Sequence, residues 1–333
     1  MSSDGGVTID VPGWRLWRRW AAAAMCMGLV LVACGGGDSG AGARTLTLYT
    51  SVTQDTVDAV VSLFEDANPN VTVDVFRAPT GELTARIAGE QRSGGLAADL
   101  LWLTDPLSLH QYEADGILVQ WSAPNARYVP ADYQTGSFVG TRILNLVMVG
   151  RPGISLSDWR DLLDVSGGIA LPDPAFAGSA FAALAYFVQT DAYGFDFYRQ
   201  LKRAGAVQVQ APGDVVNGVA EGRYAAGITL SRTATAAISD GSPLEMVWPA
   251  SGAIAIYSPM AVVSGRGSVD LAEDFVDFTL SLDAQSAIAG TGWQPVRSDV
   301  PWDSQGASVT FDWASAFDHQ QELLDQYRSI FGG

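Results

Sequence analysis

The chain has 333 residues, of which 48% are hydrophobic and 17% charged, and its formal net charge is −17. A chain of this length and composition can bury a core without disulfides or metals to hold it together. The acidity argues against nucleic acid as a partner, since no basic face is visible. We attribute the negative charge to a need for solubility outside the cell. Calcium binding is the less favoured explanation, because no EF-hand spacing of carboxylates occurs.

The N-terminus has the pattern of a secretion signal. Arginines at positions 15, 18 and 19 precede an apolar run, 21–33, which ends at Cys34 and a glycine-rich stretch. This run is shorter than the ~20 apolar residues that a membrane-spanning helix needs. We therefore expect residues 1–33 to be removed as a signal peptide. The removed part holds three arginines and two aspartates, so the mature chain would carry a charge of −18.

The sequence Leu31-Val32-Ala33-Cys34 resembles the lipobox of bacterial lipoproteins, in which the cysteine is acylated and becomes the first mature residue. The resemblance implies lipidation of Cys34 and an extracytoplasmic protein anchored to the outer face of the cell membrane. Residues 34–44 are expected to form a flexible tether. A buried core cysteine is the alternative, but a Gly/Ser-rich run cannot bury apolar area.

The cysteine count limits the chemistry of the mature chain. Its other cysteine, Cys26, lies in the removed segment, so the folded part would have no free thiol. We therefore expect no disulfide, no zinc–cysteine site and no cysteine nucleophile there.

Strands and helices alternate after the tether. Residues 45–50 alternate like a strand, and 54–67 carry apolar side chains at helical spacing. An alternating strand at 71–76, a helix at 80–90 and an apolar strand at 98–103 follow. This order predicts a mostly parallel sheet covered by helices. Ligands of such sheets sit beyond the C-terminal ends of the strands, where helices begin.

A second block of the same kind predicts a second α/β lobe. Its expected strands are 142–149, 169–171, 207–210 and 224–230, and its expected helices are 156–163, 180–190, 196–204 and 214–221. The chain then returns to helices at 270–282, 283–289 and 313–331.

Several segments resemble type II extracellular solute-binding proteins, in the branch that serves ferric-ion, phosphonate, sugar-phosphate and thiamine importers of the ABC class. The segments are Leu46-Thr-Leu-Tyr-Thr-Ser51, Thr80-Gly-Glu-Leu83, Asp99-Leu-Leu101, Val139-Gly-Thr-Arg142, Asp173-Pro174 with Gly178-Ser179, and Gly222-Arg-Tyr-Ala-Ala-Gly-Ile228.

The resemblance implies an α/β, two-lobed periplasmic-binding-protein-like fold of type II, with two mixed sheets flanked by helices and joined by crossing hinge strands. Lobe 1 would comprise 45–140 and the return segment 251–290, lobe 2 would comprise 141–250, and helices would fill 291–333. The crossing strands are expected near 138–144 and 249–257.

In that family the lobes close on a small solute, and the closed form docks on a membrane permease that works with an ATPase. We expect such a transport role, without a cofactor, for a monomer. We expect no enzymatic activity, since the chain has no Gly-x-Ser-x-Gly elbow, no metal-ligand cluster and no histidine beside a nucleophile.

The ligand-binding residues that we expect follow strand ends or lie at the crossings. They are Ser51, Thr80, Gly81, Asp105, Arg142, Gly178, Ser179, Ser231, Arg232 and Tyr257.

The chemistry of these residues favours an anion, such as a phosphonate or a phosphate ester. Ferric-ion members of the family place adjacent tyrosines where this chain has Ser231 and Arg232, and the chain's histidines, His110 and His319, have no partner ligand. Side-chain binding of a metal is therefore disfavoured. Arg142 and Arg232, with hydroxyls at helix starts, would suit an anionic head group.

Other roles remain open for the same residues. Arg232 could pair with Asp240 on the surface, Arg142 could brace the hinge, and the Ser and Thr residues could be ordinary helix caps. Asp105 could cap a helix before Pro106 or pair with an amine, and Tyr257 could form a wall for an organic ligand. A ferric-ion importer component without the tyrosine pair, or a ligand receptor for a membrane sensor, are the alternative functions.

Overall fold

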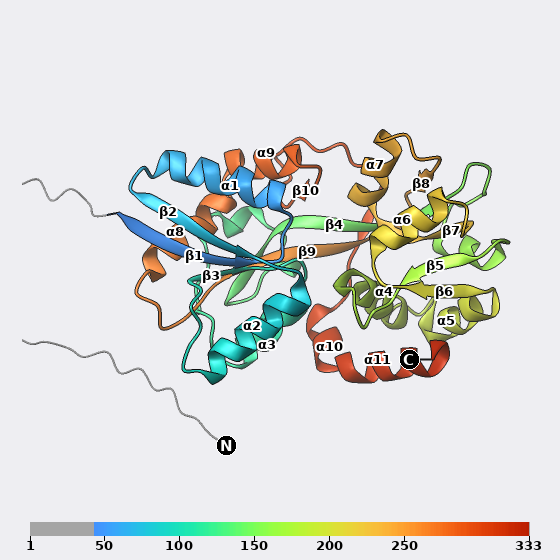
Figure 1. Ribbon diagram of the computed structural model, residues 1–333, viewed down its shortest axis with the longest axis horizontal. Coiled ribbons are helices and arrows are strands. Elements are labelled where there is room, and N and C mark those ends of the chain that lie inside the picture. The colour runs from blue at the N-terminus through green and yellow to red at the C-terminus, as the bar shows by residue number, and fades with distance from the viewer. Residues whose placement is uncertain (1–42, 333) are drawn as a thin grey trace, which may run out of the picture. The chain divides into compact units, whose positions relative to one another are not determined.

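The computed structural model describes residues 43–332 (Figure 1). The predicted signal peptide, Cys34 and nearly all of the tether lie outside the described residues. Within 43–332, no helix is both long and apolar enough to cross a membrane.

Lobe 1 is built on three parallel strands, β1 (Arg44–Thr50), β2 (Val71–Arg77) and β3 (Leu100–Trp102). The helices α1 (Gln54–Ala67), α2 (Thr80–Arg92) and α3 (Leu107–Ala114) follow these strands, and α8 (Val269–Thr279) and α9 (Leu282–Gly290) return to the lobe later. In Figure 1, α1 and α9 lie on one side of the strands, and α2 and α3 on the other. The apolar face of α1 packs inward, with Phe64 in edge contact with Phe275 of α8, 4.9 Å between ring centroids.

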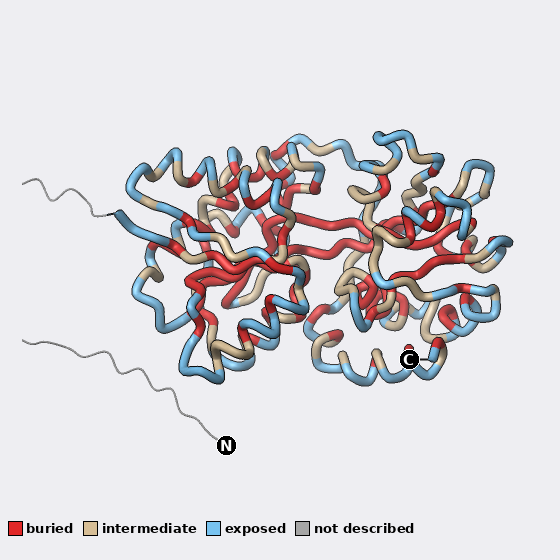
Figure 2. The backbone as a smooth tube through the Cα atoms, viewed as in Figure 1, coloured by how far each residue is buried: buried red, intermediate tan, exposed pale blue. Residues whose placement is uncertain are grey.

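Two long strands connect the lobes. β4 (Phe138–Gly150) and β9 (Ala253–Val262) run antiparallel and are buried at every position, as the continuous red strands of Figure 2 show. Strands buried on both faces carry apolar runs rather than alternating patterns. The ladder along β4 and β9 joins the sheets of both lobes into one, in the order β2-β1-β3-β9-β4-β7-β5-β6.

Lobe 2 contains the parallel strands β5 (Ile169–Pro172), β6 (Ala206–Val209) and β7 (Ala226–Leu230), and the short β8 (Glu245–Val247). Its helices are α4 (Gly178–Gln189), α5 (Gly194–Arg203), α6 (Pro212–Ala220) and α7 (Ser231–Ser239). The apolar α4 is the most buried of these helices, as expected of a helix that packs on several sides.

The C-terminal segment crosses between the lobes a third time. β10 (Gln294–Pro295) pairs with β4 at residues 142–143, and β11 (Ser308–Val309) pairs with the first residues of β9. The segment ends in α10 (Trp313–Asp318) and α11 (Gln320–Phe331). Tyr327 of α11 packs on Tyr198 of α5, with 5.1 Å between ring centroids, so the C-terminus belongs to the core of lobe 2.

The fold class is confirmed, and most expected elements agree with the structure to within a few residues. The sheet is mixed, as the resemblance implied, because β4 and β9 run antiparallel to each other at its centre. The alternation of strands and helices alone predicts a mostly parallel sheet. The helix expected at 156–163 is a 3-10 helix, Trp159–Asp164, begun by Asp158. The expected single helix 313–331 is interrupted at His319, which lets Trp313 contact Tyr257 while α11 packs on α5. The lobe boundaries themselves stay predictions.

Candidate functional site

Arg142 of β4 is a buried cation without an ion-pair partner in the described part of the chain. Its side chain is 1% exposed and lies under the start of α1. Its Nη1 donates to Thr53 Oγ1 and Thr56 Oγ1 at 3.4 Å each, which are long bonds, and its Nε has no hydrogen-bond partner. A buried charge is costly unless it is paired. Burial lowers the pKa of Arg142 to about 9, with Asp55 acting against this shift.

Arg232 of α7 links lobe 2 to lobe 1. Its guanidinium forms an ion pair with Asp55 in the first turn of α1, and its Nε donates to the carbonyl of Thr291 at 2.7 Å. The surface pair with Asp240 is therefore not present; the backbone of Asp240 instead ends α7. Both guanidinium groups also contact the Trp293 ring, with the Cζ of Arg142 at 4.5 Å and that of Arg232 at 5.1 Å from the ring centroid.

A third guanidinium belongs to the same neighbourhood. Arg77 at the end of β2 donates from Nε to the carbonyl of Val52, at 2.7 Å, in the loop between β1 and α1. Its charge, like that of Arg232, lowers the pKa of Arg142. We call Arg77, Arg142 and Arg232 the arginine cluster. It surrounds the N-terminus of α1, where free backbone N–H groups and the helix dipole also favour an anion.

The lobes meet again at Asp105 and Gly178. Asp105 follows β3 in lobe 1, is buried, and accepts a hydrogen bond from the backbone N–H of Leu107 at 3.2 Å. Gly178 begins α4 in lobe 2, and a Cβ there would lie 2.5 Å from Asp105 Oδ2. Only glycine permits this close approach. Burial raises the pKa of Asp105 to about 6, against the effect of the Leu107 hydrogen bond.

Ser51 lies at the end of β1, beside the end of β3. Thr104 N donates to Ser51 Oγ at 3.0 Å, and Thr104 Oγ1 donates to the Ser51 carbonyl at 3.0 Å. These bonds tie the two strand ends together, so the Ser51 hydroxyl already serves a structural role.

The structure does not bring all the expected ligand residues together. Thr80 and Gly81 begin α2, and a Cβ at Gly81 would meet nothing within 4 Å. Ser179 follows Gly178 in the first turn of α4. Ser231 begins α7 and lines, with Arg232, a cavity of about 420 Å³ that also includes Trp248 and Trp302.

Tyr257 faces away from Arg142. It pairs with Ile143 across the β4–β9 ladder, whereas Arg142 pairs with Ser258. Directly paired residues project from the same face of a sheet, and neighbours along a strand project from opposite faces. Tyr257 and the arginine cluster therefore lie on opposite faces of the crossing strands.

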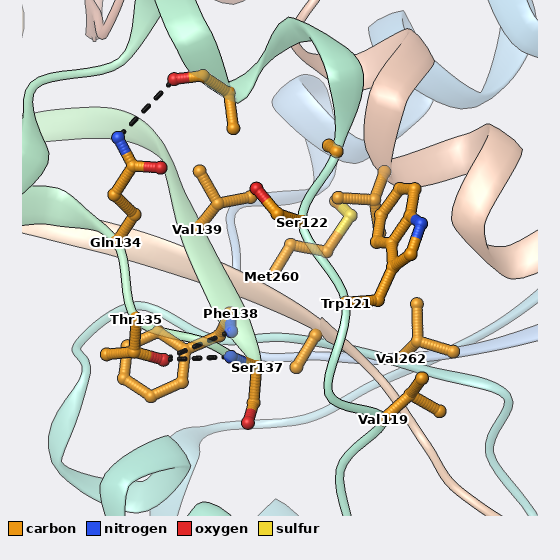
Figure 3. Close-up of a pocket in the computed structure, with 14 residues that line it drawn as sticks. Val119, Trp121, Ser122, Gln134, Thr135, Ser137, Phe138, Val139, Met260 and Val262 are labelled. Carbon is orange, nitrogen blue, oxygen red and sulfur yellow. Dashed lines mark hydrogen bonds between the residues drawn. The ribbon is translucent and has the colours of Figure 1, made fainter.

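A second cavity, shown in Figure 3, is too small for a solute. It lies within lobe 1 between the segment 119–139 and β9, and its volume is about 10 Å³. That is room for about one water molecule. Thr135 Oγ1 lies beside it and accepts hydrogen bonds from the backbone N–H groups of Ser137 and Phe138. This cavity is a gap in packing, without features of a binding site.

The two histidines pack against other parts of the fold. His110 packs edge-on against Phe138, and His319 stands between α10 and α11. Among residues 43–332, no three His, Cys, Asp or Glu side chains gather as they would around a metal ion.

Comparison with known proteins identifies the family of the chain. The model of the family described as "Bacterial extracellular solute-binding protein" matches residues 46–294. The chain belongs to this family. The resemblance found in the sequence is thereby confirmed.

Solved structures share the fold of this solute-binding protein. Iron-bound HitA from Pseudomonas aeruginosa has a TM-score of 0.73 at 20% identity, covering 86% of this chain and 99% of HitA. AfuA from Actinobacillus pleuropneumoniae, with fructose-6-phosphate bound, has a TM-score of 0.70 at 21% identity, covering 86% of this chain and 98% of AfuA. Both are two-lobed binding proteins, so the two-lobed fold is shared, whereas the bound ligands differ.

A protein of Haemophilus influenzae is 30% identical over 131 residues, 38% of this chain and 38% of its own length.

Arg77 of the arginine cluster and three residues beside it, Thr53, Asp55 and Trp293, were not predicted from the sequence. Thr53 and Asp55 lie at the start of α1, two and four residues beyond Ser51, which the sequence did indicate. Arg77 ends β2, so its position at a strand end was the available signal. Trp293 had no local signal.

Proposed function

We propose that this solute-binding protein captures an anionic solute, a phosphonate or a phosphate ester, and delivers it to the permease of an ABC importer. The observation that carries the proposal is the buried guanidinium of Arg142, whose Nε has no partner and whose neighbour Asp55 is engaged by Arg232. A phosphate or phosphonate head has several acceptor oxygens that would complete these hydrogen bonds.

The surroundings of Arg142 support the same charge preference. Arg77 and Arg232 bring two further cations, and the N-terminus of α1 adds the positive end of a 14-residue helix. The chain as a whole has a net charge of −17, so the positive charge around Arg142 is specific to this site. The residues Ser51, Thr80, Gly81, Gly178, Ser179 and Ser231 stay candidates for further contacts to the solute.

Closure of the two lobes would complete the proposed anion site. Arg232 comes from lobe 2, Arg77 and the start of α1 come from lobe 1, and Arg142 lies on β4, which connects the two lobes. A solute that contacts both lobes stabilises the closed arrangement by its differential affinity for it. The closed arrangement would be the form that docks on the permease, as in the family.

Titration calorimetry with inorganic phosphate, alkylphosphonates, sugar phosphates and ferric citrate tests the proposal. We expect saturable binding of at least one phosphate or phosphonate ligand, and a loss of roughly 100-fold or more in affinity in Arg142→Gln, since a charge-assisted bidentate contact is lost. Arg92→Gln on the exposed end of α2 is the matched control. Binding of ferric ion alone, unaffected by Arg142→Gln, would instead favour the iron alternative.

We also propose that Cys34 carries the lipid anchor that keeps the protein at the outer face of the cell membrane. Several acyl chains at about 0.8 kcal/mol per buried CH₂ would suffice for stable anchoring. In cells, Cys34→Ser should shift the protein from the membrane fraction to the soluble fraction, whereas Ser39→Ala beside it should not. Equal membrane association of both variants would remove the anchor from the proposal.

A further inference from the structure

A cavity of about 470 Å³ lies on the face of the crossing strands opposite the arginine cluster. Its walls come from α3, the segment 131–135, Tyr257 of β9 and the segment 310–314 at the start of α10. Figure 1 shows α3 and α10 side by side at this place, and the two helices contact each other. The volume is in the range of small-molecule sites.

Both lobes hold the walls of this cavity. α3 and β9 belong to lobe 1 at this point. The start of α10 is fastened to α4 of lobe 2, because Asp312 N donates to Gln189 Oε1 at 2.9 Å and Gln189 Nε2 donates to the Asp312 carbonyl at 3.0 Å. A ligand in this cavity would therefore contact both lobes, and its binding would depend on how the lobes are arranged.

Three side chains of the cavity wall have buried polar atoms without a hydrogen-bond partner in the described part of the chain. They are His110 Nε2, Thr310 Oγ1 and Trp313 Nε1. Trp313 is 4% exposed, so its indole N–H has little access to bulk water. Buried polar groups are normally satisfied, and each exception needs an explanation. Three exceptions at one cavity indicate that a ligand or ordered water completes them.

The charges around the cavity are negative. Asp132 and Asp312 line it, and none of its lining residues is Arg or Lys. Glu113, Asp318 and Asp312 all act on the imidazole of His110, yet burial outweighs them and lowers the pKa of His110. The imidazole is therefore neutral near pH 7 and does not offset the carboxylates.

Aromatic rings supply the apolar part of the wall. Tyr257 and Trp313 stand nearly perpendicular, at 80° with 5.9 Å between ring centroids, and Phe311 lies 4.3 Å from Trp313. Rings arranged as adjoining walls, next to carboxylates, are the arrangement by which proteins bind quaternary ammonium groups.

We propose that this cavity is a second binding site, for a small organic cation of the alkylammonium class. The cation would lie against the rings of Tyr257 and Trp313, with Asp132 and Asp312 as counter-charges. Its hydroxyl or amine hydrogens would meet the unpartnered atoms of His110 and Thr310. This site does not depend on the anion site of the opposite face.

Choline is the probe, and 3,3-dimethylbutan-1-ol is its uncharged counterpart of the same shape. In calorimetry with the full chain, we expect choline to bind saturably at one site and the alcohol to bind much more weakly. Asp132→Asn should weaken choline binding roughly two- to five-fold, because the carboxylate is exposed and screened. Trp313→Phe should weaken it roughly three-fold or more, because indole is the best cation–π partner.

Asp74→Asn, at an exposed position on β2, is the matched control, and Arg142→Gln should leave choline binding unchanged. If Trp313→Phe does not fold, Thr310→Val removes an unpartnered hydroxyl at the same cavity and should also weaken binding. Equal binding of choline and the alcohol, choline affinity unchanged in both Asp132→Asn and the Trp313 or Thr310 variant, or loss of choline binding in Arg142→Gln would each overturn the proposal.

Discussion

Arg232 of α7 and Asp55 of α1 form an ion pair that spans the two lobes beside the buried Arg142. Asp55 thereby places a carboxylate near the guanidinium groups of Arg232 and Arg142, and Arg142 has no ion-pair partner among the described residues. In the proposed function, an anionic solute and the Asp55 carboxylate would compete for the same cations.

The first prediction concerns that competition. Asp55→Asn should raise the affinity for the anionic solute roughly three- to ten-fold, because a nearby like charge is removed. The unfolding free energy should fall by at most about 1 kcal/mol, since the ion pair is partly exposed and screened by solvent. Calorimetry and chemical denaturation measure the two effects, with Asp58→Asn in the same helix as control. A fall in affinity would show that Asp55 helps to hold the solute.

The second prediction separates stability from binding at Arg142. Arg142→Met should leave the ligand-free protein as stable or more stable by about 1 kcal/mol, because it replaces a buried, poorly satisfied charge with an apolar side chain of similar length. The same variant should lose anion binding. Thermal unfolding with and without the ligand measures both properties. A strongly destabilised variant would instead assign Arg142 the role of a hinge brace.

The third prediction tests the close approach of the lobes at Gly178. In Gly178→Ala, the new methyl group would meet Asp105 Oδ2 at 2.5 Å and Asp105 Cγ at 2.9 Å, and the buried carboxylate has little room to move. The lobes should separate, which should raise the radius of gyration in small-angle X-ray scattering and weaken solute binding. Gly81→Ala in α2 has no neighbour within 4 Å and is the control. Unchanged scattering would show that the backbone absorbs the clash locally.

The fourth prediction concerns pH. The pKa of Asp105 is raised to about 6 from 3.8 by burial, so between these values the folded state binds more protons than the unfolded state. The stabilising protonation is present at low pH and is lost as the pH rises to about 6. At pH 7, Asp105→Asn should therefore raise the unfolding free energy by about 2–3 kcal/mol, whereas at pH 4 the gain should nearly vanish. Denaturation curves of both proteins at the two pH values measure it; a pH-independent difference would contradict the assignment.

Much of the fold could be predicted from the sequence, because its signals are local. Helix α1 coincides with the expected 54–67, where apolar residues recur at helical spacing. The strands β1 and β2 follow from alternation in the same way. The 3-10 helix at Trp159–Asp164 and the break at His319 were not predicted, since they depend on packing against other elements.

The sequence by itself determined the family and the strand ends where the site would lie. It also showed that Ser231 and Arg232 stand where ferric-ion members of the family have adjacent tyrosines. Only the tertiary structure decided which of those residues meet. Arg232 finds its carboxylate 177 residues away, and no local pattern records such a pairing. Tyr257 and Arg142 lie on opposite faces of the sheet because side chains alternate along a strand. The pairing of β4 with β9 shifts at the bulge between Gly140 and Arg142, and a shift of one residue moves a side chain to the other face. That register separates the candidate anion site from the cavity at Tyr257.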